Sequence, residues 1–185
     1  MDQDKHPEEA NLMRRWRRYL VVILFLSGLV AAPQARGQFL FFRNPMTGQK
    51  ASDFQLRTTD GNVASFNEMR EDRPAIIFFW ATWCPHCREQ LRVLDSQRLF
   101  LEEKDIRIIL VDLGEDGRKV RSYLTRGNLS HEVLLDEDSQ VSSDYKVMGV
   151  PTYFFVDREG IIQAVEHVLP ENYAEFLCGA DKKTC

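Results

Sequence analysis

Apolar and polar positions divide the chain into a short uncharged segment near its start and a longer region of mixed pattern. Residues 19–32 read YLVVILFLSGLVAA and carry no charged side chain, and arginines within 14–18 come directly before them. A helix of this length spans about 21 Å, less than the roughly 30 Å hydrocarbon core of a membrane. Basic residues followed by an apolar stretch are typical of exported proteins. We therefore predict an export signal or membrane anchor over 1–35, with anchoring through 19–32.

The sequence at the end of this leader does not decide whether the leader is cleaved. Pro33 and Gln34 interrupt the small residues that a cleavage site needs, so cleavage and retention as an anchor both fit the sequence. The arginines stay on the cytoplasmic side in either case, which predicts an extracytoplasmic location for the rest of the chain, periplasmic or on the outer face of the membrane. Residues 36–50 contain glycine and proline without a sustained period, so we predict a linker there and a domain over 51–185.

The region after residue 50 alternates strand-like and helix-like patterns. The run AIIFFW at 75–80 is apolar throughout, as in a strand that is covered on both faces. A helical pattern over 85–104 and a second apolar run at 106–112 follow, and this order predicts a parallel pair of strands. Further expected elements are a hairpin of 54–58 and 63–66 around Asp60-Gly61, helices at 67–71, 119–126, 139–145 and 170–178, a strand at 131–135, and an antiparallel pair of 153–156 and 161–166. The predicted fold class is α/β, with a central mixed sheet flanked by helices.

Composition narrows the class of protein without identifying an activity. The 185 residues have 44% hydrophobic side chains, which is enough apolar material for one ordinary domain. The formal net charge is −4, and nucleic-acid binding generally requires a basic surface. We therefore expect no nucleic-acid partner.

The segment Trp83-Cys84-Pro85-His86-Cys87 lies between the buried strand and the following helix, and it carries the clearest chemistry. Two residues between the cysteines bring the thiols within disulfide reach across one helical turn. Pro85 suits the first helical position, which places Cys84 at the helix N-terminus, where the helix dipole favours a thiolate. His86 adds a positive charge or a hydrogen-bond donor beside it.

These positions predict dithiol–disulfide exchange. Cys84 would attack a substrate disulfide as a thiolate, and Cys87, shielded by the helix, would resolve the mixed disulfide. A zinc half-site and an inert structural disulfide are the alternatives. A zinc site needs a second ligand pair at short spacing, which the sequence does not supply, so we expect no metal and no cofactor. Cys178 and Cys185 predict a second, structural disulfide, with a redox relay as the alternative.

The segments FFWATWCPHC at 78–87 and GVPT at 149–152 resemble the thioredoxin superfamily, over about residues 51–178. The resemblance implies a three-layer fold in which Pro151 has a cis peptide bond and packs beside the two cysteines. It also implies that the Val150 backbone hydrogen-bonds an extended substrate segment. The substrate-binding residues expected on this basis are Trp83, Pro85, His86, Val150 and Pro151.

Within the superfamily, the opening hairpin and an extra strand and helix between Cys84 and Pro151 are similar to the TlpA/ResA group. Members of that group are extracytoplasmic, usually membrane-anchored thiol-disulfide oxidoreductases, and several reduce cytochrome c or copper-site cysteines. The resemblance implies a specific reductant. Its expected partners are exported proteins with disulfides or dithiols, together with a membrane electron donor or acceptor.

Glu115 follows the second buried strand, at a position where ResA-like proteins carry an acid near the cysteines. The resemblance implies that Glu115 transfers protons with the cysteines, and a solvated loop acid is the alternative. Thioredoxin itself has a buried aspartate at a strand position that is Phe78 here. Glu115 is therefore the only nearby acid that the sequence suggests.

The dipeptide Pro85-His86 leaves the direction of electron flow open. It is the dipeptide of DsbA-like oxidases, whereas the long helical insertion of DsbA is missing here. A DsbA-like oxidase or isomerase is therefore one alternative to the reductant. A non-catalytic thioredoxin-like module that binds a peptide or a metal-carrying partner is another. A peroxiredoxin is not favoured, because the Thr-x-x-Cys arrangement of that group is absent from the sequence.

Overall fold

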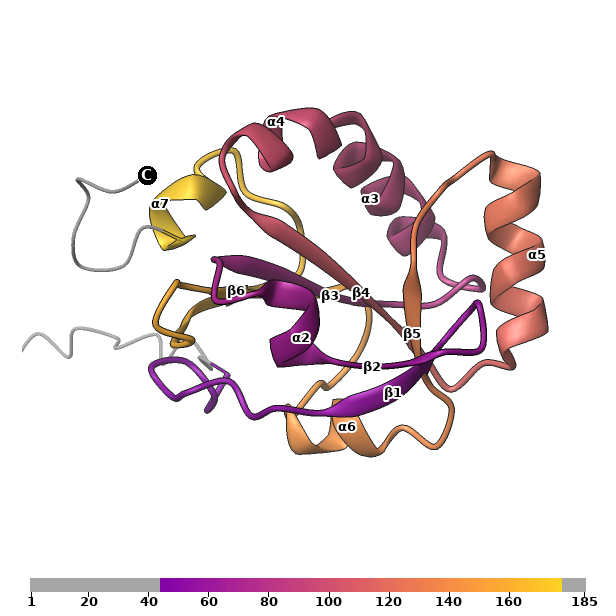
Figure 1. Cartoon of the computed structure of the whole chain (residues 1–185), viewed down its shortest axis with the longest axis horizontal. Coiled ribbons are helices and arrows are strands. Elements are labelled where there is room, and N and C mark those ends of the chain that lie inside the picture. The colour runs from indigo at the N-terminus through magenta and orange to yellow at the C-terminus, as the bar shows by residue number, and fades with distance from the viewer. Residues whose placement is uncertain (1–43, 178–185) are drawn as a thin grey trace, which may run out of the picture. The chain divides into compact units, whose positions relative to one another are not determined.

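A computed structural model of the chain describes residues 44–177, which build a seven-stranded sheet with helices on both faces (Figure 1). The predicted export segment over 1–35, the first part of the predicted linker, and Cys178 and Cys185 lie outside the described residues. Among residues 44–177, no helix combines the length and the apolar character that a membrane crossing would need.

Strand β3 (Ala75–Trp80) runs inside the sheet, and all of its residues are buried. Side chains along a strand point alternately to the two faces, so β3 contributes to a hydrophobic core on each face. The first core contains Ile76, Phe78 and Trp80, and the second contains Ala75, Ile77 and Phe79. The structure confirms the prediction of a strand covered on both faces.

The sheet is mixed, in the order β2-β1-β5-β4-β3-β6-β7. β3 is parallel to β4 and β4 to β5, whereas the other neighbouring pairs are antiparallel. The remaining strands are β1 (Gln55–Thr58), β2 (Val63–Ser65), β4 (Arg107–Leu113), β5 (Val133–Asp136), β6 (Thr152–Val156) and β7 (Ile162–Glu166). The predicted hairpin, parallel pair and final antiparallel pair are therefore all confirmed.

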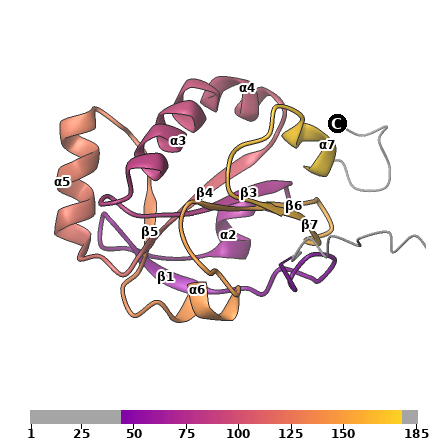
Figure 2. The ribbon, with the colours of Figure 1, turned by 180° about the vertical axis from the view of Figure 1, so that it is seen from behind.

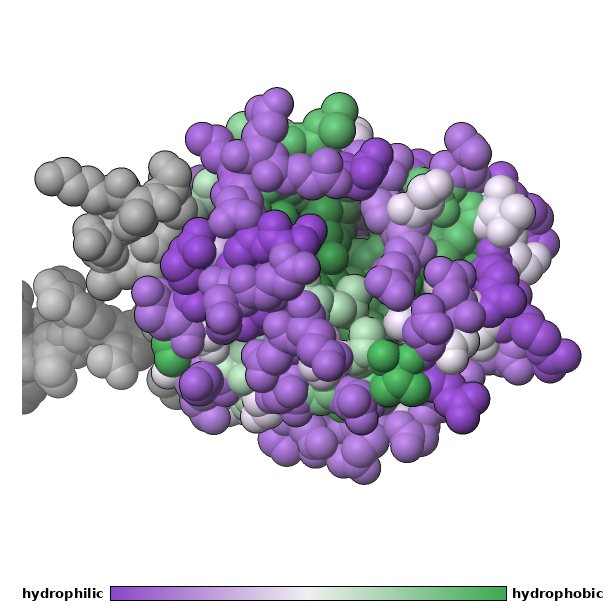
Figure 3. Space-filling view, in the orientation of Figure 1, coloured by the Kyte–Doolittle hydropathy of each residue, from purple (hydrophilic) through white to green (hydrophobic). Residues whose placement is uncertain are grey.

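The helices are divided between the two faces of the sheet (Figures 1 and 2). They are α2 (Phe66–Arg70), α3 (Pro85–Ser96), α4 (Arg98–Glu103), α5 (Gly117–Gly127), α6 (Gln140–Asp144) and α7 (Tyr173–Leu177). α3, α4, α5 and α7 pack on the first core, and α2 and α6 pack on the second. This is the three-layer α/β fold that the resemblance implied. Hydrophilic side chains cover most of the face shown in Figure 3, and apolar residues come to the surface mainly near its centre.

Side-chain caps set where several helices begin. Ser65 and Glu68 form a reciprocal capping box at the start of α2, and Asp116 accepts the Arg118 N–H at the start of α5. Such caps satisfy backbone N–H groups that have no partner within the helix. The start of α5 also matters for the site, because its cap residue, Asp116, comes directly after Glu115 in the sequence.

The single helix predicted over 85–104 is wrong in one respect, since the structure divides it at Gln97 into α3 and α4. The Gln97 backbone has φ −97° and ψ 0°, and its N–H is shared between several preceding carbonyls. The Gln97 side chain accepts a hydrogen bond from the Tyr173 hydroxyl of α7 at 2.8 Å. Such a distant partner leaves no trace in the local apolar pattern.

The predicted boundary between linker and domain at residue 51 needs correction. Met46 is buried in the second core, and Lys50 forms a β-bridge with Ile161. The Gly48 N–H donates to the Ile162 carbonyl at 2.7 Å. Residues 44–50 thus pack against the domain. Their glycine- and proline-containing sequence does not predict this, because the backbone groups that they pair with lie in and next to β7.

Candidate active site

The two cysteines lie where the chain passes from β3 to α3. Cys84 is the N-cap residue of α3, with an extended backbone, and Pro85 takes the first helical position. Proline fits there because the first turn of a helix does not use its N–H groups and because its fixed φ matches the helix. The local sequence therefore places the Cys84 sulfur at the positive end of the helix dipole, as predicted.

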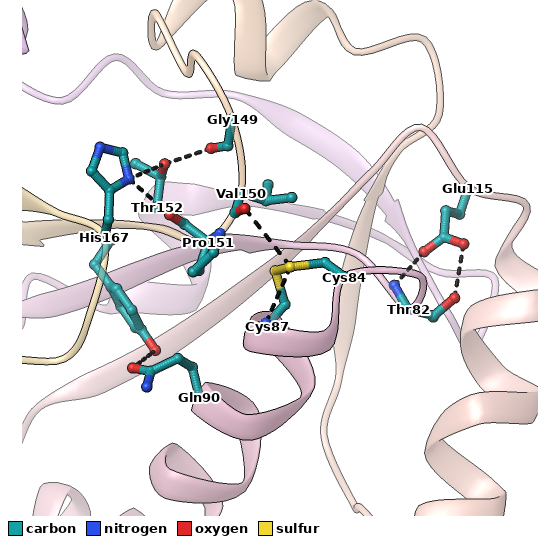
Figure 4. The surroundings of a disulfide bond; sticks show 11 residues. Thr82, Cys84, Cys87, Gln90, Glu115, Gly149, Val150, Pro151, Thr152 and His167 are labelled. Atoms are coloured by element: carbon teal, nitrogen blue, oxygen red, sulfur yellow. Dashed lines mark hydrogen bonds between the residues drawn. A yellow bond between two sulfur atoms is a disulfide. The ribbon is translucent and has the colours of Figure 1, made fainter.

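A disulfide joins Cys84 and Cys87, whose Cα atoms are 5.2 Å apart (Figure 4). The Cys87 N–H donates to Cys84 Sγ at 3.1 Å. Cys84 is 5% exposed and is flanked by exposed residues, whereas Cys87 is 0% exposed in the first core. Cys84 is therefore the more accessible of the two cysteines.

The loop before β6 approaches the disulfide from the other side. The Val150–Pro151 peptide bond is cis, as the resemblance implied, and the Val150 carbonyl oxygen is 3.7 Å from Cys84 Sγ. Figure 4 shows this loop facing the cysteine pair. Val150 and Pro151 are half-buried, so part of each residue is open to a bound segment.

His167, the residue directly after β7, contacts this loop and was not predicted from the sequence as a site residue. Its Nδ1 lies 2.9 Å from the Pro151 carbonyl oxygen and 3.2 Å from Thr152 Oγ1. The carbonyl can only accept, so Nδ1 carries the proton that is donated to it. The β6–β7 register pairs Tyr153 with Glu166, which brings the next residue, His167, opposite Thr152. Only strand pairing could have revealed this contact.

The predicted substrate-binding residues on the cysteine side are open to solvent. Trp83 is 59% exposed, and Pro85 and His86 are also exposed. Met148, in the loop that leads to Val150, is 95% exposed and was not predicted.

Glu115 is buried and binds the segment just before Cys84. Its carboxylate accepts hydrogen bonds from the Thr82 N–H at 2.5 Å and the Thr82 hydroxyl at 2.8 Å (Figure 4). Lys119 forms an ion pair with it at 2.6 Å. Burial by itself raises the pKa of Glu115, but the hydrogen bonds from Lys119 and Thr82 outweigh burial and lower it. Within the described residues, Glu115 thus contacts the loop that carries Cys84 and Lys119 of α5, and no recorded contact joins it to a sulfur atom.

Asp112 is a second buried acid, so the inference that Glu115 is the only nearby acid was wrong. Asp112 is 0% exposed in β4 and interacts with Glu115. Burial, followed by the charge of Glu115, raises the pKa of Asp112 to about 8. Asp112 is the last residue of the apolar run predicted at 106–112, and a single acid at that end does not change the strand pattern.

Gln90 connects α3 to the strands next to the site and was also missed. Its Oε1 accepts the Tyr153 hydroxyl at 3.1 Å and the Leu169 N–H at 2.9 Å. One amide oxygen thus ties the helix that carries Cys87 to β6 and to the segment after β7. Among residues 44–177, no group of three or more histidine, cysteine or acidic side chains could hold a metal ion.

The chain is similar in sequence and fold to known thiol-disulfide oxidoreductases. The sequence matches the AhpC/TSA family over residues 47–165. It is 26% identical over 164 residues to the thiol-disulfide oxidoreductase ResA of Bacillus thuringiensis (strain Al Hakam), covering 89% of this chain and 93% of ResA. It is 30% identical over 155 residues to the thiol:disulfide interchange protein DsbE of Pseudomonas fluorescens biotype C, covering 82% of this chain and 84% of DsbE. A solved thiol:disulfide interchange protein from Bacteroides sp. shares the fold, with a TM-score of 0.62 and 23% identity over 74% of this chain and 93% of that one.

Proposed function

Because this chain belongs to the AhpC/TSA family and is a thiol-disulfide oxidoreductase, we propose that it reduces disulfides of exported proteins through Cys84 and Cys87. The observation that carries the proposal is the difference between the two sulfur positions. Cys84 caps α3 and receives the Cys87 N–H, whereas Cys87 is fully buried. A helix N-terminus and a donated hydrogen bond both stabilise a thiolate, so Cys84 is the attacking cysteine.

The reaction proceeds in two exchange steps. The Cys84 thiolate attacks one sulfur of the substrate disulfide, forms a mixed disulfide, and releases the other substrate sulfur as a thiolate that takes up a proton. Cys87 then loses its proton and attacks Cys84 Sγ, which releases the second substrate thiol and forms the Cys84–Cys87 disulfide. Two electrons pass to the substrate, and a membrane electron donor restores the dithiol.

The substrate is an extended segment with apolar side chains next to its disulfide. Trp83 and Met148 expose apolar surface, and the Val150 backbone lies beside Cys84. Cysteines of apocytochrome c or of a metal site, in an exported partner, are the specific substrates proposed. The arginine-rich apolar leader over 1–35 supports an extracytoplasmic location and anchoring through 19–32.

Turnover with two disulfides tests the proposal. The full chain should reduce a peptide with an oxidised Cys-x-x-Cys-His segment, the haem-attachment pattern, faster than a small symmetric disulfide. Cys84→Ser should abolish both activities, and Cys87→Ser should accumulate a mixed disulfide that mass spectrometry identifies. Full turnover by Cys84→Ser would refute the assignment of the attacking cysteine.

An oxidase is the second candidate, and His86 favours it. An exposed histidine beside the helix N-terminus stabilises the thiolate and with it the reduced form of the protein. The reduction potential separates the two directions. A value near about −270 mV supports the reductant, and one near about −120 mV supports a DsbA-like oxidase. An intact cysteine pair that exchanges with no disulfide would instead indicate a binding module.

A further inference from the structure

Asp112 occupies a core position on the same face of the sheet as the cysteines. It lies beside Trp80 of β3 and Leu135 of β5 in the parallel registers. Paired residues of parallel strands point to the same face, and both neighbours belong to the first core, which also contains Cys84 and Cys87. An acid in such a position is costly unless its charge or its hydrogen bonds are satisfied.

Within residues 44–177, neither side-chain oxygen of Asp112 has a fully formed hydrogen bond, although the backbone N–H of Glu115 acts on the carboxyl and lowers its pKa slightly. The polar side chain that acts most strongly on them is Glu115, with a weaker effect from Lys119, and an ionised carboxylate such as Glu115 is only an acceptor. Two carboxyl groups that interact in a buried site repel each other unless one of them holds a proton. The arrangement of Asp112 and Glu115 is therefore that of a carboxyl–carboxylate pair that holds one proton.

The surroundings decide which of the two acids carries the proton. Burial raises the pKa of Asp112 to about 8, whereas hydrogen bonds from Lys119 and Thr82 outweigh burial at Glu115 and lower its pKa. The charged group that faces the pair from α5 is Lys119, and Tyr123 of α5 packs on Trp80 beside it. At neutral pH Asp112 is thus the neutral acid and Glu115 the anion.

We propose that Asp112 is a positioning residue for Cys84: its carboxylic acid donates a hydrogen bond to Glu115, which in turn holds the Thr82 segment that leads into the cysteine. The contacts of Glu115 with the Thr82 N–H and hydroxyl supply the second half of this connection. Thr82 is two residues from Cys84, the N-cap residue of α3, and the Cys84 N–H donates to the Ala81 carbonyl in the same turn, so a shift of Thr82 would be passed to the start of α3. This inference rests on the proposed role of Cys84 as the attacking cysteine.

Loss of the Asp112 proton has a definite consequence. A second negative charge would then face Glu115, so the two carboxylates would repel each other and the hold on Thr82 would weaken. The same charge disfavours a thiolate at Cys84, which lies on the same face of the sheet. The reactivity of Cys84 should therefore decline at alkaline pH instead of staying level after the thiol has ionised.

Alkylation of the reduced full chain by iodoacetamide, with peptide mapping to isolate the Cys84 adduct, measures this reactivity without any substrate. Asp112→Asn keeps a donor of the same size and does not titrate. Its Cys84 rate should equal that of the native chain near about pH 6 and exceed it by about threefold or more near about pH 9. Asp116→Asn, which removes the same charge from an exposed position in the same loop, should keep the native profile.

Two results would overturn the inference. One is the same pH profile for the native chain and Asp112→Asn. The other is a carboxyl carbon of Asp112 that titrates near about pH 4 in the NMR spectrum of the native chain, which would leave no shared proton. Neither result depends on disulfide turnover, so a failure here is distinct from a failure of the proposed exchange activity.

Discussion

Asp112 lies on the same face of β4 as Leu110 and Ile108, two and four residues earlier, and both of these residues pack in the first core. A carboxyl group can occupy this buried position because Asp112 holds a proton and is therefore uncharged beside the Glu115 carboxylate. His167 shows the same dependence on a distant partner, since its ring proton is committed to the Pro151 carbonyl. At the scale of single residues, the protonation of Asp112 and of His167 therefore follows from the group that each side chain faces.

The raised pKa of Asp112 makes stability depend on pH. Its pKa is about 8 in the folded chain and close to 3.8 when unfolded, so between these values the folded state keeps a proton that the unfolded state releases. The free energy of unfolding should therefore fall as pH rises through this window, with a slope that approaches about 1.4 kcal/mol per pH unit from this group. The stabilisation is complete below the lower value and lost above about pH 8.

Urea unfolding of the oxidised chain over this range checks the expectation against Asp112→Asn, which does not titrate. The difference between the two free energies of unfolding should shift steadily in favour of the variant up to about pH 8 and then level off. Comparison with the variant cancels the contributions of the other acids. A difference that stays constant across the range would contradict a raised pKa.

At the scale of elements, α3 has two tasks that different residues perform. Its first turn presents Cys84 and buries Cys87, and its second turn fixes the helix to the sheet through Gln90. The fixation matters because the loop with Val150 and Pro151 leads directly into β6, which Gln90 contacts through Tyr153. The helix and the loop are thereby held in one arrangement around the disulfide.

Gln90→Leu should lower the free energy of unfolding by about 1–3 kcal/mol, because it leaves the Tyr153 hydroxyl and the Leu169 N–H without their acceptor. Gln90→Glu keeps an acceptor of the same length and should lose less. Urea denaturation of both variants, with unchanged denaturant dependence, measures the difference. Equal losses in the two variants would show that the amide oxygen does not make this connection.

At the scale of the whole molecule, residues from widely separated parts of the chain close the second core. Met46 enters it from the segment before the hairpin, and Val141 enters it from α6. The segment around Met46 is fastened to β7 by backbone hydrogen bonds at Gly48 and Gln49. The domain body therefore extends at least to residue 44, and part of the predicted linker contributes to stability.

Met46→Ala in the full chain should cost about 2 kcal/mol or more in unfolding free energy, because it removes a buried side chain and leaves a cavity. Met148→Ala is the matched control, since Met148 is 95% exposed, and it should change stability by less than about 0.5 kcal/mol. Thermal or urea unfolding compares the two. Similar losses for both methionines would mean that residues 44–50 do not pack on the core.

The elements were predicted well where neighbouring residues decide them. Examples are the apolar run of β3, the turn at Asp60-Gly61 and the proline after Cys84. Each of these patterns involves only a few consecutive residues, so it can be recognised in the sequence. The break at Gln97 and the order at Gly48 were missed for the opposite reason. Each of these residues forms a hydrogen bond with a segment that is far away in the sequence.

The sequence by itself determined the α/β class, the pattern of strands and helices, and the cysteine pair at a helix N-terminus, because short-range periodicity and helix-start chemistry specify them. Only the tertiary structure decided what surrounds that pair. Thr82 and Glu115 are 33 positions apart, and Gln90 and Leu169 are 79 apart. Burial of Asp112 likewise exists only once three strands and α5 have closed around it. Contacts of this kind depend on strand order and packing, which no local pattern encodes.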